Sequence, residues 1–138
     1  MGKTNGQVEV FDLLAGETDN RIAVASQAVV YTETFLCEKN VNYSFEYQFD
    51  SDAAAVVSCK IELEQGNTPP VTEGSADGNM VIPEDSADFD LVVSDELVHI
   101  KAYAPAVSRF LRAKITGLVA NTATVKLVRF NVCTIVNL

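Results

Sequence analysis

The stretch Asn42–Asp50 (NYSFEYQFD) alternates aromatic and polar side chains along its whole length. Its aromatic residues are Tyr43, Phe45, Tyr47 and Phe49. Successive side chains of a β-strand point to opposite faces, so this period of two predicts an antiparallel strand with one buried and one solvated face. Four aromatic side chains on an exposed face could stack on sugars, but they would also make an apolar patch that soluble monomers rarely carry. We therefore assign them to the core.

The same period-two alternation recurs in other segments on both sides of this stretch. Val57, Cys59, Ile61 and Leu63 alternate with polar residues and predict a second strand. Further segments rich in Val, Ile, Phe and Tyr are predicted strands: Val8–Leu14, Ile22–Tyr31, Thr32–Leu36, Leu91–Val93, Val98–Ala104, Arg109–Thr116 and Thr124–Val132. No long helical pattern is present, which excludes helix-rich enzyme folds. The pattern predicts an all-β antiparallel sandwich, jelly-roll-like, with about eight or nine short strands and long loops.

The length of 138 residues fits one domain. We expect residues 1–7 to form a polar N-terminal arm and residues 8–138 to form a single β-sandwich domain. The start of the chain has no apolar segment of the kind a secretory signal needs, and no apolar run is long enough to span a membrane. The Pro- and Gly-rich segment Gln65–Gly78 predicts a long loop that is either functional or simply solvated.

Charge is distributed unevenly along the chain. The net charge is −9, which disfavours nucleic acid as a partner. The segment Leu97–Leu138 has six Lys and Arg residues and no Asp or Glu, so it carries +6 and leaves −15 for the remainder. Two interpretations stay open. The basic C-terminal strands could pair with acidic N-terminal strands, or the molecule could have a basic docking face and an acidic solvent face.

Residues able to carry out chemistry are scarce and scattered. Cys37, Cys59 and Cys133 show no paired spacing, and Cys59 fits a small buried hydrophobe. The one histidine, His99, lies in an alternating run opposite the face of Val98, Ile100 and Ala102 and has no evident catalytic partner. Acidic residues that could offer oxygen ligands to calcium occur in two groups without an EF-hand spacing: Asp50 and Asp52, and Glu84, Asp85, Asp88 and Asp90. We expect no cofactor, no metal and no enzymatic activity.

Three stretches of the chain resemble small β-sandwich decoration, or cement, proteins of tailed bacteriophage capsids. They are Lys60–Pro70 (KIELEQGNTPP), Glu96–Pro105 (ELVHIKAYAP) and Arg109–Gly117 (RFLRAKITG), the last followed by Asn121-Thr122-Ala123. The resemblance implies a jelly-roll-like domain without catalytic activity. It also implies self-association, as a trimer by preference or as a dimer, and docking on the outside of a capsid.

The expected partner is therefore the major capsid protein, with no nucleic acid and no membrane, and the expected location is the virion surface after synthesis in the host cytoplasm. The residues that we expect to contact partners are Arg109, Arg112, Lys114, Gly2, Lys3, Thr4, Pro69 and Pro70. Two alternatives keep the fold. One is a carbohydrate- or receptor-binding module with Tyr31, Tyr103 or the Gln65–Gly78 loop as its platform, and the other is a head–tail adaptor or tail subunit.

Overall fold

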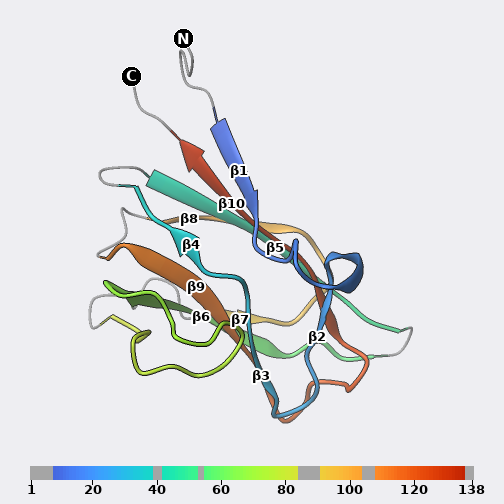
Figure 1. Cartoon of the computed structure of the whole chain (residues 1–138). Helices are drawn as coiled ribbons and strands as arrows, with labels where there is room; N and C mark the ends of the chain where they lie inside the picture. The colour runs from blue at the N-terminus through green and yellow to red at the C-terminus, as the bar shows by residue number, and fades with distance from the viewer. Residues whose placement is uncertain (1–7, 39–41, 53–54, 84–90, 104–107, 136–138) are drawn as a thin grey trace.

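Two antiparallel β-sheets pack face to face in this protein (Figure 1). The structure, a computed structural model, describes residues 8–38, 42–52, 55–83, 91–103 and 108–135. The only helical segment among them is the short 3₁₀ helix η1 (Thr18–Asn20). The predicted all-β antiparallel sandwich is confirmed. None of the described segments is a helix that could cross a membrane.

Each sheet contains five strands. In the first sheet the hydrogen-bonded order is β1 (Val8–Asp12), β10 (Lys126–Ile135), β5 (Asn42–Asp50), β8 (His99–Tyr103), and β2 (Ile22–Ala23) also pairs with β10. In the second sheet the order is β3 (Val29–Tyr31), β9 (Phe110–Gly117), β6 (Cys59–Gly66), β7 (Leu91–Val93), and β4 (Phe35–Leu36) also pairs with β9. From β4 onward the chain changes sheet at every connection except the one from β6 to β7.

The core lies between the two sheets and contains the aromatic face of β5. Tyr43, Phe45, Tyr47 and Phe49 are all buried, as their alternation predicts. Phe130 on β10 packs against Phe45 and Tyr47, with ring centroids 5.8 and 6.2 Å away. The opposing layer is formed by apolar side chains of β6 and β9: Cys59, Ile61, Leu63, Leu111, Ala113 and Ile115. Burial of each large side chain contributes about 1.5–3 kcal/mol, so this layer supplies much of the fold's stability.

One predicted strand is divided in the structure. The segment Ile22–Tyr31 forms β2 in the first sheet and β3 in the second, which raises the number of strands among the described residues to ten. Gln27, in the connection between them, has a positive φ of 63°. The chain turns there and crosses to the other sheet, and period-two alternation alone does not reveal such a turn.

The edge strand β8 shows which of its two faces is buried. Ile100 and Val98 are 70% and 44% exposed, whereas His99 is half-buried against the Tyr47 ring. The register pairs His99 with Tyr47 and Ile100 with Glu46, so the apolar face predicted for β8 is its outer face. This orientation follows from β5, whose aromatic residues fix the direction of the core.

Candidate docking surface

Catalytic and metal-binding groups do not gather in the described part of the chain. His99 Nε2 lies 2.7 Å from Asp95 Oδ1, and this hydrogen bond lowers the pKa of Asp95. The recorded partners of His99 are thus a carboxylate and the Tyr47 ring, neither of which is a nucleophile of the kind a catalytic histidine activates. Within the described residues no group of three or more His, Cys, Asp or Glu side chains could hold a metal ion. Residues 84–90, and with them one predicted calcium group, lie outside the described residues.

Cys37 and Cys59 also lack the lowered pKa of reactive thiols. Cys59 is fully buried, as predicted, and burial raises the pKa of its thiol to about 11. Cys37 is partly buried, and desolvation raises its pKa to about 12. A reactive cysteine needs a lowered pKa, because the thiolate is the nucleophile. These two side chains therefore serve packing.

Arg112 does not form the exposed contact that the sequence predicts. Its side chain is 0% exposed, on the outer face of β9 but beneath the loop that follows β6. Arg112 Nε donates to Glu64 Oε1 at 2.9 Å, and Nη2 donates to the Ser75 carbonyl at 2.7 Å. The guanidinium also stacks 4.0 Å from the centroid of the Tyr31 ring. A side chain held in this way cannot reach a partner, so the prediction for Arg112 is wrong.

The covering loop, residues 67–80, explains this burial. Its base is closed by a pair of backbone hydrogen bonds between Gln65 and Val81, of 2.7 and 2.9 Å. Asp77 organises the loop by accepting hydrogen bonds from three backbone N–H groups, those of Val71, Thr72 and Asn79. Glu73 attaches the loop to the neighbouring chain by accepting from the backbone and hydroxyl of Thr34. The predicted Gln65–Gly78 loop is therefore a folded cover on the second sheet.

The other predicted contacts do not form one patch. Arg109 is exposed beside the Phe110 ring, and Lys114 is half-buried five residues further along β9, about 16 Å away in an extended strand. Pro69 is exposed and Pro70 is half-buried at the start of the covering loop. Gly2, Lys3 and Thr4 lie outside the described residues.

The uneven charge is largely balanced across neighbouring strands. On β9, Arg112 and Lys114 lie opposite Glu64 and Glu62 of β6. On β10, Lys126 lies opposite Asp50, and Arg129 Nη1 is 3.3 Å from Glu46 Oε1. The cross-strand interpretation of the charge asymmetry is confirmed at these four cations. They therefore do not make a separate basic docking face.

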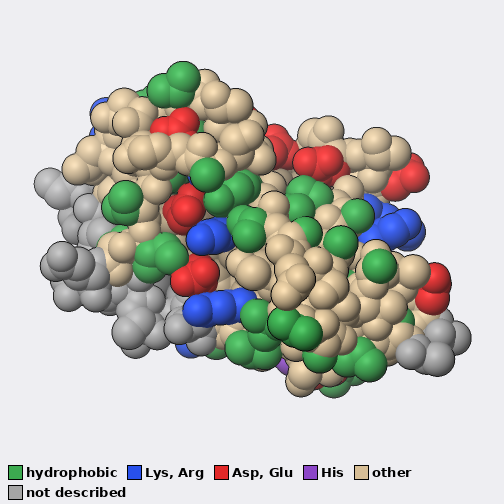
Figure 2. All heavy atoms as spheres, turned by 90° about the horizontal axis from the view of Figure 1, so that it is seen from below, with side chains coloured by type: hydrophobic (Ala, Val, Ile, Leu, Met, Phe, Trp, Pro, Cys, Tyr) green, Lys and Arg blue, Asp and Glu red, His purple; other side chains and the backbone are tan. Residues whose placement is uncertain are grey.

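A surface that the predictions missed lies at one end of the sandwich. Three segments without a single charged residue meet there: residues 24–29, 55–58 and 117–125. We call this region the uncharged end. Its exposed side chains include Val119, Val56 and Val29, which are 77%, 53% and 46% exposed. Figure 2 views the molecule from below and shows hydrophobic side chains between two groups of charged ones.

Dense hydrogen bonding holds the uncharged end together. Buried Asn121 lies at its centre, where its Oδ1 accepts from the Ser58 N–H at 2.9 Å and its Nδ2 donates to the Val24 carbonyl at 2.7 Å. Thr122 and Val56 are joined through two further hydrogen bonds, of 2.9 and 2.8 Å. The backbone of Gly117 approaches so closely that a Cβ there would lie 2.1 Å from the Ala25 carbonyl oxygen. The three segments therefore form one fixed surface.

A fixed, uncharged and partly apolar surface has the properties of the centre of a protein interface. Interface centres are depleted in charged residues, and a surface that is already ordered loses less conformational entropy on binding. The sequence carries a signal for this surface, namely the three charge-free runs in a chain of which 21% is charged. What the sequence does not show is that the fold brings these runs together.

The predicted sugar-binding platform is not formed by Tyr31. Its ring is only 8% exposed and is covered by the Arg112 guanidinium. The side chain of Tyr103 lies outside what the structure describes. The covering loop presents no aromatic residue, since residues 67–80 contain none. A stacked sugar would need an open aromatic face, which Tyr31 does not offer.

Comparison with known proteins does not assign the chain to a family. The sequence matches no protein-family model, and a search of curated proteins gives no significant match.

Proposed function

We propose that the chain is a non-enzymatic capsid-decoration subunit that docks on the major capsid protein through its uncharged end and self-associates on the virion surface. The observation that carries this proposal is the uncharged end itself, a fixed apolar surface on a protein of net charge −9. Burial of Val119, Val56 and Val29 would supply binding energy, while the charged remainder of the surface stays solvated and limits association between particles.

The strand order supports the jelly-roll part of the proposal. The order β1-β10-β5-β8 faces the order β3-β9-β6-β7, with the chain crossing repeatedly between sheets. Two interlocked Greek keys of eight strands would give this order, with β2 and β4 as short additions. Jelly rolls host many functions, so the order supports the fold and leaves the function to the surface.

Val119→Asp tests the docking surface. Val119 is the most exposed large hydrophobic residue of the uncharged end, and its burial is worth about 1.5–3 kcal/mol. We expect the variant to fold normally and to bind at least about tenfold more weakly to shells of the phage that encodes the chain, assembled without it. Co-sedimentation with those shells measures the binding.

The matched control is Val71→Asp, since Val71 is 85% exposed but lies in the covering loop, away from the uncharged end. It should bind as the unmodified chain does. Equal binding by both variants would contradict docking through the uncharged end. Failure of the unmodified chain to bind the shells, together with selective binding on a glycan array, would replace the decoration proposal with the carbohydrate-binding alternative.

A further inference from the structure

An apolar strip runs along β8, an edge strand of the first sheet, on the face turned away from the core (Figure 1). It consists of Val98, Ile100 and Ala102, which share one face because successive side chains of a strand alternate. Ile100 is 70% exposed, Val98 is 44% exposed and Ala102 is also exposed. We call these three residues the β8 strip. An exposed apolar edge strand is a template for pairing with another chain.

The hydrogen bonds of β10 show which of its residues bond to which neighbouring strand. The Leu13 N–H donates to the Phe130 carbonyl, so Phe130 bonds toward the β1 side of the sheet. Alternate residues of a central antiparallel strand bond to the same neighbour. Asn131 therefore bonds to the other side, where Glu46 of β5 lies opposite it.

The same alternation, applied to β5, shows which peptide groups of β8 point outward. Because Glu46 bonds to β10, its neighbour Tyr47 bonds to His99 of β8. The peptide groups of Ile100 and Ala102 therefore point away from β5, toward the edge of the sheet. Among the residues that the structure describes, only β5 pairs with β8. This edge is therefore suited to a further strand.

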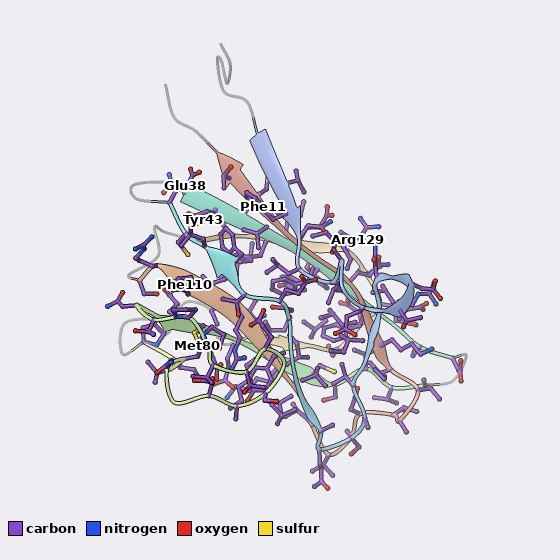
Figure 3. The ribbon with its side chains drawn as sticks, in the orientation of Figure 1. Phe11, Glu38, Tyr43, Met80, Phe110 and Arg129 are labelled. Atoms are coloured by element: carbon purple, nitrogen blue, oxygen red, sulfur yellow. The ribbon has the colours of Figure 1, made fainter. Side chains whose placement is uncertain are left out.

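The charged side chain next to the β8 strip is directed away from it. Glu46 lies opposite Ile100 on the outer face. Its Oε1 accepts from Arg129 Nη1 and Asn131 Nδ2, both at 3.3 Å. Both donors belong to β10, on the far side of β5 from β8, and Arg129 is labelled in Figure 3. The carboxylate is thus directed toward β10, which leaves the β8 strip apolar.

We propose that β8 pairs with β8 of a second copy of the chain, antiparallel, about a two-fold axis at Ile100. Ile100 then lies opposite Ile100 of the second copy, and Val98 lies opposite Ala102 of the second copy. Opposing residues in this register differ by an even number of positions, so their side chains share a face and their outward-pointing peptide groups meet. The register maps onto itself under the two-fold axis, and the assembly closes as a dimer.

Charge favours this register over its neighbour. An axis at Lys101 would place two lysines directly opposite each other, which is unfavourable. The axis at Ile100 instead places Lys101 opposite His99 of the second copy, whose Nε2 lies 2.7 Å from Asp95 Oδ1 of that same copy. Lys101 also interacts within its own copy, but an ammonium has three N–H donors and can donate to Asp95 as well. The contact forms twice, because each copy supplies one Lys101 and one Asp95.

This inference deepens the self-association in the proposed function and rests on that part of it. It selects a dimer over a trimer, because two-fold strand pairing closes with two copies. Docking through the uncharged end involves other residues and is tested separately.

The first test is the mass of the purified chain by light scattering over a range of concentrations. We expect a dimer. Ile100→Asp should weaken it at least about tenfold, because two carboxylates would then face each other across the axis. Val10→Asp is the matched control, since Val10 is 63% exposed on β1, the opposite edge strand of the same sheet. Circular dichroism shows whether both variants remain folded.

A monomeric or trimeric unmodified chain, or a dimer that Ile100→Asp leaves unchanged, would overturn the proposal. Val119→Asp, the docking variant, should remain a dimer. A monomer that still binds capsid shells would overturn pairing through β8 and would leave the docking proposal standing.

The second test locates the pairing. Ile100→Cys is introduced into a chain in which Cys37 and Cys133 are replaced by Ser, while buried Cys59 is kept. At the axis the two Cα atoms of position 100 would lie about 5.5 Å apart, a separation that suits a disulfide. Mild oxidation should therefore yield covalent dimers.

Ala102→Cys in the same background is the matched control. In the proposed register the two introduced cysteines lie about 14 Å apart along the strands, too far for a disulfide. Absence of covalent dimers of Ile100→Cys would show that the edge is closed, for instance by residues 84–90 or 104–107, which lie outside the described residues. Equal yields from both variants would show that the register is wrong. Either result would overturn the proposal.

Discussion

Arg112 illustrates how a residue's surroundings decide its role. Its guanidinium is buried, yet it has one carboxylate partner, one carbonyl and one aromatic face. Among the described residues its Nη1 has no hydrogen-bond partner, so the site is not fully satisfied. Burying a charge is costly, and the attraction of Glu64 mainly offsets that cost. The pair with Glu64 therefore adds little net stability, whereas the hydrogen bond from Arg112 to the Ser75 carbonyl fixes the covering loop to β9.

Glu64→Gln should lower the free energy of unfolding by about 3 kcal/mol, because it leaves the buried Arg112 charge uncompensated. Urea denaturation measures the change. Glu62→Gln, two residues earlier on the same strand, is the control. Glu62 pairs with Lys60 at 3.7 Å near the surface, and its loss should cost less than about 1 kcal/mol. Equal effects of the two substitutions would show that Arg112 does not depend on Glu64.

At the scale of elements, the covering loop is a small folded unit that depends on one carboxylate. The hydrogen bonds from the backbone N–H groups of Asn79, Thr72 and Val71 lower the pKa of Asp77 below its ordinary value of 3.8. A group whose folded pKa is lowered stabilises the fold above its unfolded pKa, and this stabilisation is lost as the pH falls through the folded value. The loop should therefore loosen below about pH 4 and not at neutral pH.

Asp77→Asn tests this pH dependence, because an amide oxygen can accept hydrogen bonds but does not titrate in this range. We expect the protection of the Val71 and Thr72 amides from hydrogen exchange to fall between pH 5 and pH 2 in the unmodified chain, and to change less in the variant. Asp52→Asn, an exposed aspartate in another loop, should behave as the unmodified chain does. A pH dependence that survives Asp77→Asn would contradict this assignment.

The elements also show how far the sequence could predict the fold. The strands that include Tyr43–Phe49 and Cys59–Leu63 were predictable because their alternation reflects contacts with a single core. The burial of the Arg112 side chain could not be predicted in this way, because it depends on Ser75 and Tyr31, which are 37 and 81 positions away in the sequence. The outward face of Ile100 was equally hidden, since period two defines two faces without saying which one is buried.

At the scale of the whole molecule, charged residues lie on the two sheets, and the uncharged end is held together by hydrogen bonds of uncharged groups. Opposite charges pair across the strands of each sheet, whereas the end formed by residues 24–29, 55–58 and 117–125 has none. That end connects loops of both sheets through Asn121, which bridges the segment after β2 and the segment before β6. Stability of the sandwich and shape of the uncharged end therefore depend on the same side chain.

Asn121→Ala should lower the free energy of unfolding by about 2–4 kcal/mol, because it leaves the part-buried Ser58 N–H and the buried Val24 carbonyl without this partner. It should also weaken binding to capsid shells, since the docking surface loses its fixed shape. Thr124→Ala, an exposed position in the same loop, should change stability by less than about 0.5 kcal/mol. Thermal and urea denaturation measure both variants. Unchanged stability of Asn121→Ala would mean that the loops hold together without the bridge.

The position of β10 has a consequence for how the protein is made. This strand pairs with β1, β2 and β5 in the first sheet, yet it follows all of them along the chain and is the last strand among the described residues. While the ribosome is still translating, the earlier strands of that sheet lack the neighbour that joins them. The first sheet therefore cannot assemble until β10 has been synthesised, and the nascent chain must keep the aromatic face of β5 from associating with other chains until then.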